Sequence, residues 1–129
     1  MPVSNIDHIN LRAPRELLDE LRAFYANVVG LTDGHRPPFR EFGYWMYAGE
    51  RAIVHLSLAA EGEVRAADVP STFAHVAFAC SDRASYERRL SEYDVAYKVA
   101  VVPEAGVTQF FLQDPAGNTV ELSFDSEAT

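Results

Sequence analysis

Cysteine is nearly absent from this sequence, which has a single one, Cys80, among 129 residues. One cysteine excludes an internal disulfide and suits a reducing compartment, so we expect a cytoplasmic protein. Long apolar runs are absent too, since no stretch approaches the roughly 18 apolar residues of a membrane-spanning helix. Basic charge is scarce: 11 Lys and Arg stand against 19 Asp and Glu, for a net charge of −8. We therefore expect neither a nucleic-acid partner nor an anionic membrane surface.

The sequence contains an internal repeat. Residues 120–124 align with residues 54–58, serine on serine and Glu121 on His55. Residues 74–78 align with residues 7–11 at nearly the same shift, which places His75 on His8. Two copies, rather than three or more, indicate a duplicated module and not a solenoid.

Each copy shows the pattern of a βαβββ module, so the predicted fold class is α+β. The first module is expected over residues 1–59 and the second over residues 73–125, joined by a polar linker, residues 60–72, into one domain. The expected elements of the first module are strand 3–11, a helix from Pro14 to Gly30, and strands 31–35, 42–47 and 51–58. Those of the second are strand 73–80, a helix capped by Ser81 or Asp82, and strands 95–101, 107–112 and 118–124.

Strand alternation places the repeated polar residues on one face of each module. In the last strand Val120 and Leu122 point one way and Glu121 the other. The same parity separates His55 from its apolar neighbours. Small residues share the polar face and leave room for a substrate there, namely Ser57, Ala77, Ala79 and Ser123.

The repeated positions carry His8, His55, His75 and Glu121, all of them possible metal ligands. Imidazole and carboxylate groups are good ligands for Fe2+, Mn2+, Ni2+, Co2+ and Zn2+. Two histidines and one carboxylate leave coordination positions open for a substrate with two oxygens. The alternative for each histidine alone is an ordinary core or surface residue. His35 has no repeat partner, and we assign it to the surface.

The chain resembles the vicinal oxygen chelate superfamily, also called the glyoxalase/bleomycin-resistance/extradiol-dioxygenase superfamily. The resemblance covers nearly the full length and rests on residues 6–11, 24–31, 73–78 and 114–122. It implies paired modules that form cup-shaped, partly open barrels around one divalent ion. It also implies His8, His75 and Glu121 as a two-histidine, one-carboxylate ligand set, and a homodimer.

His55 departs from the family pattern. The resemblance implies Glu at this place in glyoxalase I-like members and often Gln in related epimerases. A histidine here fits either a fourth ligand or a base that moves protons near the open coordination position. The departure argues against a strict glyoxalase I assignment.

The repeat also predicts the rest of the pocket, because it places Trp45 at the equivalent position to Phe111. We expect four residues on the metal side: Trp45, Tyr47, Gln109 and Phe111. The alternative is that the aromatic ones simply fill a barrel. The Tyr47 hydroxyl can donate to a metal-bound oxygen anion. Arg36 and Arg40 flank a proline loop, where they either meet a substrate carboxylate or are only solvated.

These residues favour a metal-dependent enzyme acting on a small metabolite that chelates the ion through two oxygens. His55, Glu121 and Tyr47 are the expected catalytic residues. A lyase or isomerase is favoured over an extradiol-type ring-cleaving dioxygenase, because a fourth protein ligand would crowd an O₂ site. The alternative from another class is a non-catalytic protein that binds or sequesters a small molecule in the same cup.

Overall fold

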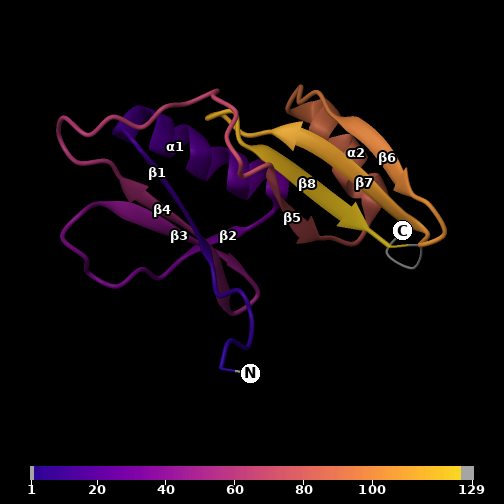
Figure 1. Ribbon diagram of the computed structural model, residues 1–129, viewed down its shortest axis with the longest axis horizontal. Coiled ribbons are helices and arrows are strands. Elements are labelled where there is room, and N and C mark those ends of the chain that lie inside the picture. The colour runs from indigo at the N-terminus through magenta and orange to yellow at the C-terminus, as the bar shows by residue number, and fades with distance from the viewer. Residues whose placement is uncertain (1, 126–129) are drawn as a thin grey trace. The chain divides into compact units, whose positions relative to one another are not determined.

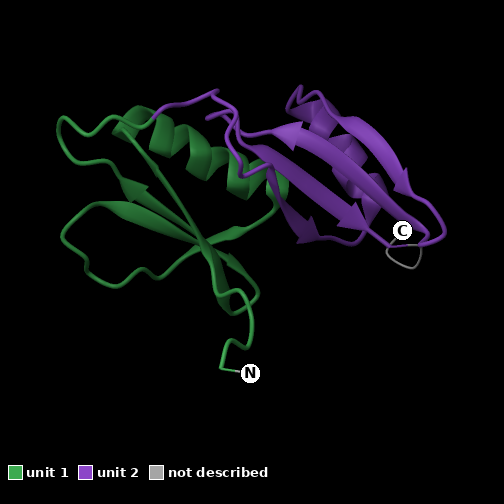
Figure 2. Ribbon diagram, viewed as in Figure 1, with its two compact units in different colours: residues 1–65 green, residues 66–129 purple. Residues whose placement is uncertain are grey.

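The computed structural model describes residues 2–125, and the chain divides into two compact units, residues 1–65 and 66–129 (Figure 2). The division falls inside the polar stretch 60–72. Each unit has one four-stranded sheet with its own helix (Figure 1). The predicted α+β fold of two βαβββ modules is confirmed, and each sheet is open.

The first unit pairs its first strand with its last. Its strand order is β1-β4-β3-β2, with β1 parallel to β4 and the other neighbours antiparallel. The elements are β1 (Ile9–Ala13), α1 (Arg15–Phe24), a π-helical turn η1 (Tyr25–Val29), β2 (Thr32–Gly34), β3 (Gly43–Ala48) and β4 (Arg51–Leu58).

Helix α1 covers one face of the first sheet. Pro14 caps its start in an extended conformation, as suits a residue without an N–H. Leu18 and Leu21 are fully buried, and α1 packs on β4, where Val54 and Leu56 are buried as well. Each such side chain contributes about 1.5–3 kcal/mol of hydrophobic free energy. The core of this unit therefore lies between α1 and the face of β4 opposite His55.

The second unit repeats the plan with strand order β5-β8-β7-β6 and a parallel β5–β8 pair. Its elements are β5 (His75–Ala79), α2 (Arg83–Glu92), β6 (Lys98–Val102), β7 (Val107–Gln113) and β8 (Thr119–Phe124). Asp82 caps α2, as predicted, and its side chain accepts a hydrogen bond from the Ser85 N–H. The buried residues of this unit include Leu90, Phe110, Leu112, Val120, Leu122 and Phe124.

A tight turn leads into β8. The buried Asp114 carboxylate accepts hydrogen bonds from the backbone N–H groups of Ala116 at 2.9 Å and Asn118 at 3.0 Å. Gly117 has φ +85°, a conformation that disfavours other residues. This turn fixes where β8 begins, and with it the position of Glu121.

Several strands differ in extent from the prediction: β6 begins at Lys98 rather than at residue 95, and the largest difference is in the first strand. The first strand was expected over residues 3–11, but β1 begins at Ile9, where its ladder with Val54 starts. Apolar and polar residues also alternate before Ile9, but the described ladder does not extend to them, and Val3 and Ile6 are exposed. His8 therefore lies just ahead of the strand rather than within it. In the described part of the chain no helix is long and apolar enough to cross a membrane.

Candidate active site

In the first unit, three rings form one stack. The His8 and His55 rings lie 3.7 Å apart between centroids with 14° between their planes. Trp45 covers the other side of His55 at 4.0 Å and 11°. Trp45 and His55 are direct cross-strand partners on β3 and β4, so strand register sets this contact. The stack holds both imidazoles in fixed orientations.

Hydrogen bonds determine which nitrogens of the His8 and His55 rings remain free to bind a metal or take up a proton. His8 Nδ1 lies 2.7 Å from Asp7 Oδ2, and this bond lowers the pKa of the Asp7 carboxyl. Asp7 is then ionised and accepts, so His8 Nδ1 donates and Nε2 stays open. His55 Nε2 donates to the Ala52 carbonyl at 3.1 Å, which leaves its Nδ1 open. Partners of this kind commonly orient metal-binding histidines.

His55 is held in its neutral form. Burial lowers the pKa of His55 most, and the neighbouring His8 lowers the pKa further. Only 8% of the His55 surface is exposed. A neutral imidazole can ligate a metal or accept a proton.

In the second unit, His75 and Glu121 form the matching pair. His75 Nε2 lies 3.0 Å from Glu121 Oε1, and Glu121 is 6% exposed. Gln109 Nε2 donates to the other carboxylate oxygen, Oε2, at 3.1 Å. The Phe111 ring meets the His75 ring edge-on at 5.6 Å between centroids. Gln109 and Phe111 thus lie beside the predicted ligands of their own unit.

The two pairs occupy equivalent places in the two sheets. His8 immediately precedes β1 and His75 is the first residue of β5, while His55 and Glu121 lie in β4 and β8. Within residues 2–125, no three His, Cys, Asp or Glu side chains gather into one group. Each unit brings two predicted ligands together.

Two cavities of the first unit adjoin the ring stack. One of about 350 Å³ is lined by Asp7, His8, Asn10, Arg36, Phe39, Glu41, Trp45, His55, Leu56 and Ser57. Another of about 320 Å³ is lined by Asp7, Trp45, Tyr47, Glu50, Arg51, Ala52 and His55. The Tyr47 hydroxyl donates to the His35 carbonyl at 2.6 Å. Arg40 is exposed and lines neither cavity.

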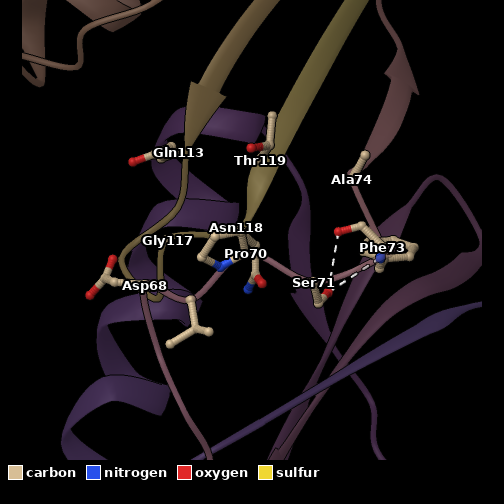
Figure 3. A pocket seen from close by; sticks show the side chains of 10 residues that line it. Asp68, Pro70, Ser71, Phe73, Ala74, Gln113, Gly117, Asn118 and Thr119 are labelled. Carbon is tan, nitrogen blue, oxygen red and sulfur yellow. Dashed lines mark hydrogen bonds between the residues drawn. The ribbon is translucent and has the colours of Figure 1, made fainter.

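A third cavity, of about 450 Å³, lies in the second unit (Figure 3). Its walls are the segment from Asp68 to Ala74 and the segment from Gln113 to Thr119. Ser71 accepts from the Phe73 N–H at 3.2 Å and so shapes one wall. His75 and Glu121 are outside its lining.

Sequence reasoning assigned no role to several residues of the site, among them Asp7, Asn10 and Phe39. Asp7 immediately precedes His8, and this adjacency was the available signal for a hydrogen-bonded partner of the ring. Asn10 is paired in register with His55, which only the strand pairing reveals.

Comparison with known proteins decides the family. A model of the Glyoxalase/Bleomycin resistance protein/Dioxygenase superfamily matches residues 5–122. The chain belongs to this superfamily.

Similarity to individual proteins agrees with this family assignment. Glyoxylase I 4 of Arabidopsis thaliana is 30% identical, and the match covers 93% of this chain and 70% of that protein. Lactoylglutathione lyase from Agrobacterium tumefaciens has a similar structure, with a TM-score of 0.64, 24% identity and 98% of each chain covered.

A mutant of the fosfomycin resistance protein FosX from Listeria monocytogenes, solved with Mn(II) and 1S,2S-dihydroxypropylphosphonic acid, also has a TM-score of 0.64. Its identity is 16%, with 93% of this chain and 91% of that chain covered. The lactoylglutathione lyase and FosX structures both have the same fold as this chain.

Proposed function

We propose that this chain is a divalent-metal-dependent enzyme acting on a small metabolite that chelates the ion through two oxygens. The observation that carries the proposal is the repeated pair of candidate ligand side chains at equivalent places in the two sheets: His8 with His55, and His75 with Glu121. We propose these four as the ligand set, with His55 as either the fourth ligand or a nearby base.

The donor chemistry fits such an ion. Three imidazoles and one carboxylate suit Fe2+, Mn2+, Ni2+, Co2+ or Zn2+. A neighbouring group forms a hydrogen bond with one polar atom of each of three proposed ligands, His8, His55 and Glu121. Hydrogen bonds of this kind orient metal ligands in proteins. The Mn(II) in the FosX structure supports the same class of ion. A bound ion supplies a Lewis acid that stabilises negative charge on a chelated substrate oxygen.

The chain's own residues supply proton transfer and positioning. His55 is neutral because burial lowers its pKa, so its open Nδ1 can take a proton from a substrate. Trp45 and His8 keep the ring from turning. Glu121 is buried and held by Gln109, which fixes the direction of its carboxylate.

A lyase or isomerase reaction is the favoured type. The similarity to glyoxylase I 4 and the lactoylglutathione lyase supports it. A fourth ligand at His55 would crowd an O₂ site, which disfavours extradiol ring cleavage. The proposed assembly is a homodimer, from the family resemblance, and the proposed compartment is the cytoplasm, from the single Cys80.

A second candidate function is binding without turnover. The cavity beside His55 has an aromatic side, where Phe39 and Trp45 lie 6.1 Å apart between ring centroids. Such a wall suits a flat apolar ligand. A sequestering protein of this kind would need no metal.

The deciding experiment is elemental analysis of untagged protein beside three variants, His8→Ala, Glu121→Ala and His35→Ala. We expect near-stoichiometric metal that the first two variants lose and the exposed His35→Ala control keeps. Iron together with oxygen uptake would redirect the assignment to a dioxygenase. Absence of metal even after reconstitution would overturn the enzyme proposal and leave the binding function.

A further inference from the structure

The cavity of about 350 Å³ beside the ring stack has hydrogen-bond donors on one part of its lining and aromatic rings on another. Asn10 and Arg36 are the donors, and Phe39 and Trp45 are the rings. All four belong to the first unit, so the cavity is described entirely within it. Its chemistry points to a ligand with a negative oxygen group and an apolar body.

A hydrogen-bonded chain orients the Asn10 amide. Arg12 Nη1 lies 3.4 Å from Ser57 Oγ, and the Ser57 hydroxyl donates to Asn10 Oδ1 at 2.8 Å. Arg12 is itself fixed by Glu63, with 2.8 Å between Nε and Oε2. Because the Asn10 oxygen is already occupied, the amide offers its NH₂ donors to the cavity.

Arg36 is a desolvated cation on the same lining. Its side chain is 14% exposed, its guanidinium carbon lies 4.8 Å from the Phe39 ring centroid, and its Nη1 donates to the Glu41 carbonyl at 2.9 Å. Its Nε has no partner in the described chain but is buried beside Gly43, so the donor it offers to a ligand is Nη2, whose contact with Glu41 is 3.9 Å long. A guanidinium with unused donors in a partly dry site is a strong receptor for carboxylates.

Glu41 does not neutralise this receptor. Its carboxylate lies 3.9 Å from Arg36 Nη2 and its side chain is 47% exposed. An ion pair this long and this solvated contributes little. The other acid on the lining, Asp7, is engaged with His8. The positive charge of Arg36 therefore remains available to a ligand.

We infer that this cavity binds the carboxylate of a small substrate, with Asn10 and Arg36 donating to its oxygens and Trp45 packing against its apolar body. The inference specifies the substrate class of the proposed enzyme. It depends on the proposed function only in calling the bound carboxylate a substrate. Carboxylate binding itself needs no metal, so it is testable separately.

Trp45 is the single tryptophan of the chain, so its fluorescence reports directly on this cavity. Metal-stripped protein is titrated with phenylacetate and, as a matched neutral ligand, with phenylacetamide. We expect saturable binding of phenylacetate and at least about 10-fold weaker binding of phenylacetamide, as a lost charge-assisted hydrogen bond predicts. Equal binding of the two ligands would overturn the inference.

Two variants test the donors. Asn10→Asp keeps the acceptor for Ser57 and replaces the NH₂ by an anion, and Arg36→Gln removes the cation. Each is expected to weaken phenylacetate binding at least about 10-fold, with circular dichroism confirming the fold. Arg88→Gln, on the exposed surface of α2, removes the same charge and should bind like wild type. If Arg36→Gln does not fold, the test depends on Asn10→Asp. Wild-type affinity of the Asn10→Asp variant for phenylacetate would then overturn the inference.

Failure here is distinguishable from failure of the proposed function. Protein that holds metal but does not prefer phenylacetate retains the enzyme proposal and loses the carboxylate site. Protein that prefers phenylacetate but holds no metal retains the carboxylate site as a binding function.

Discussion

His55 lies between two rings, with the His8 centroid 3.7 Å away on one side and Trp45 at 4.0 Å on the other. This stack gives His55 two separable roles, packing through its faces and chemistry through its edge.

Substitutions at position 55 can separate these roles. His55→Phe keeps a flat ring between His8 and Trp45, so we expect it to fold like wild type. It should lose bound metal if His55 is the fourth ligand, and keep metal but lose activity if His55 is the nearby base. His55→Ala removes the ring and leaves a void, which we expect to lower the free energy of unfolding by about 2 kcal/mol more than the Phe variant. Chemical denaturation and metal analysis measure the two effects. Equal stability of the two variants would show that the stack contributes nothing to folding.

Gln109 is expected to support the metal through Glu121. Gln109→Ala removes the 3.1 Å hydrogen bond to Glu121 Oε2. Loss of such an orienting partner commonly weakens metal affinity about 10- to 100-fold. Competition with a chelator measures the affinity. Gln113→Ala, at the exposed end of the same strand, is the matched control and should keep the wild-type affinity.

Glu63 makes the stability of the first unit depend on pH. Hydrogen bonds from Arg12, Arg65 and the Ala60 N–H lower the pKa of Glu63 from 4.5 to about 2. The unfolded chain therefore takes up this proton first as the pH falls, and the stabilisation present above pH 4.5 is lost between 4.5 and about 2. We expect Glu63→Gln to be less stable than wild type at about pH 7, with the difference shrinking across that window. A difference that stays constant down to about pH 2 would contradict this role.

Two left-handed glycines should respond differently to alanine. Gly62 has φ +79° and open space around the position of a Cβ, so Gly62→Ala carries only the backbone strain, about 1 kcal/mol. At Gly117 the added Cβ would also lie 2.8 Å from the Asp68 Cα. We expect Gly117→Ala to lower the thermal unfolding midpoint clearly more than Gly62→Ala does. Equal midpoints would mean that the segment at Asp68 moves aside without cost.

Much of the fold could be predicted because the repeat and the strand alternation act locally. The parity that buries Val120 and Leu122 and places Glu121 on the opposite face follows from period-2 geometry. The Asp82 cap and the turn at Asp114 follow from side chains that bond nearby backbone groups.

The parts that depend on contacts between distant segments could not be predicted. The start of β1 at Ile9 is set by where its ladder with β4 begins. The His8–His55–Trp45 stack depends on side-chain rotation as well as register. Arg36 and Arg40 looked alike in sequence, but only Arg36 is covered by Phe39 and lines the cavity. Ligand assignments for His8, His55, His75 and Glu121 stay predictions until metal is measured.

The parallel pairing of β1 with β4 and of β5 with β8 has a consequence for biosynthesis. Each sheet joins its earliest strand to its latest, so a growing chain holds β1 unpaired until residues 51–58 have been made. The second sheet waits in the same way for residues 119–124. Each unit is therefore expected to fold late and in one step, and a ribosome stalled between α2 and β8 would carry a finished first sheet beside an unfinished second one.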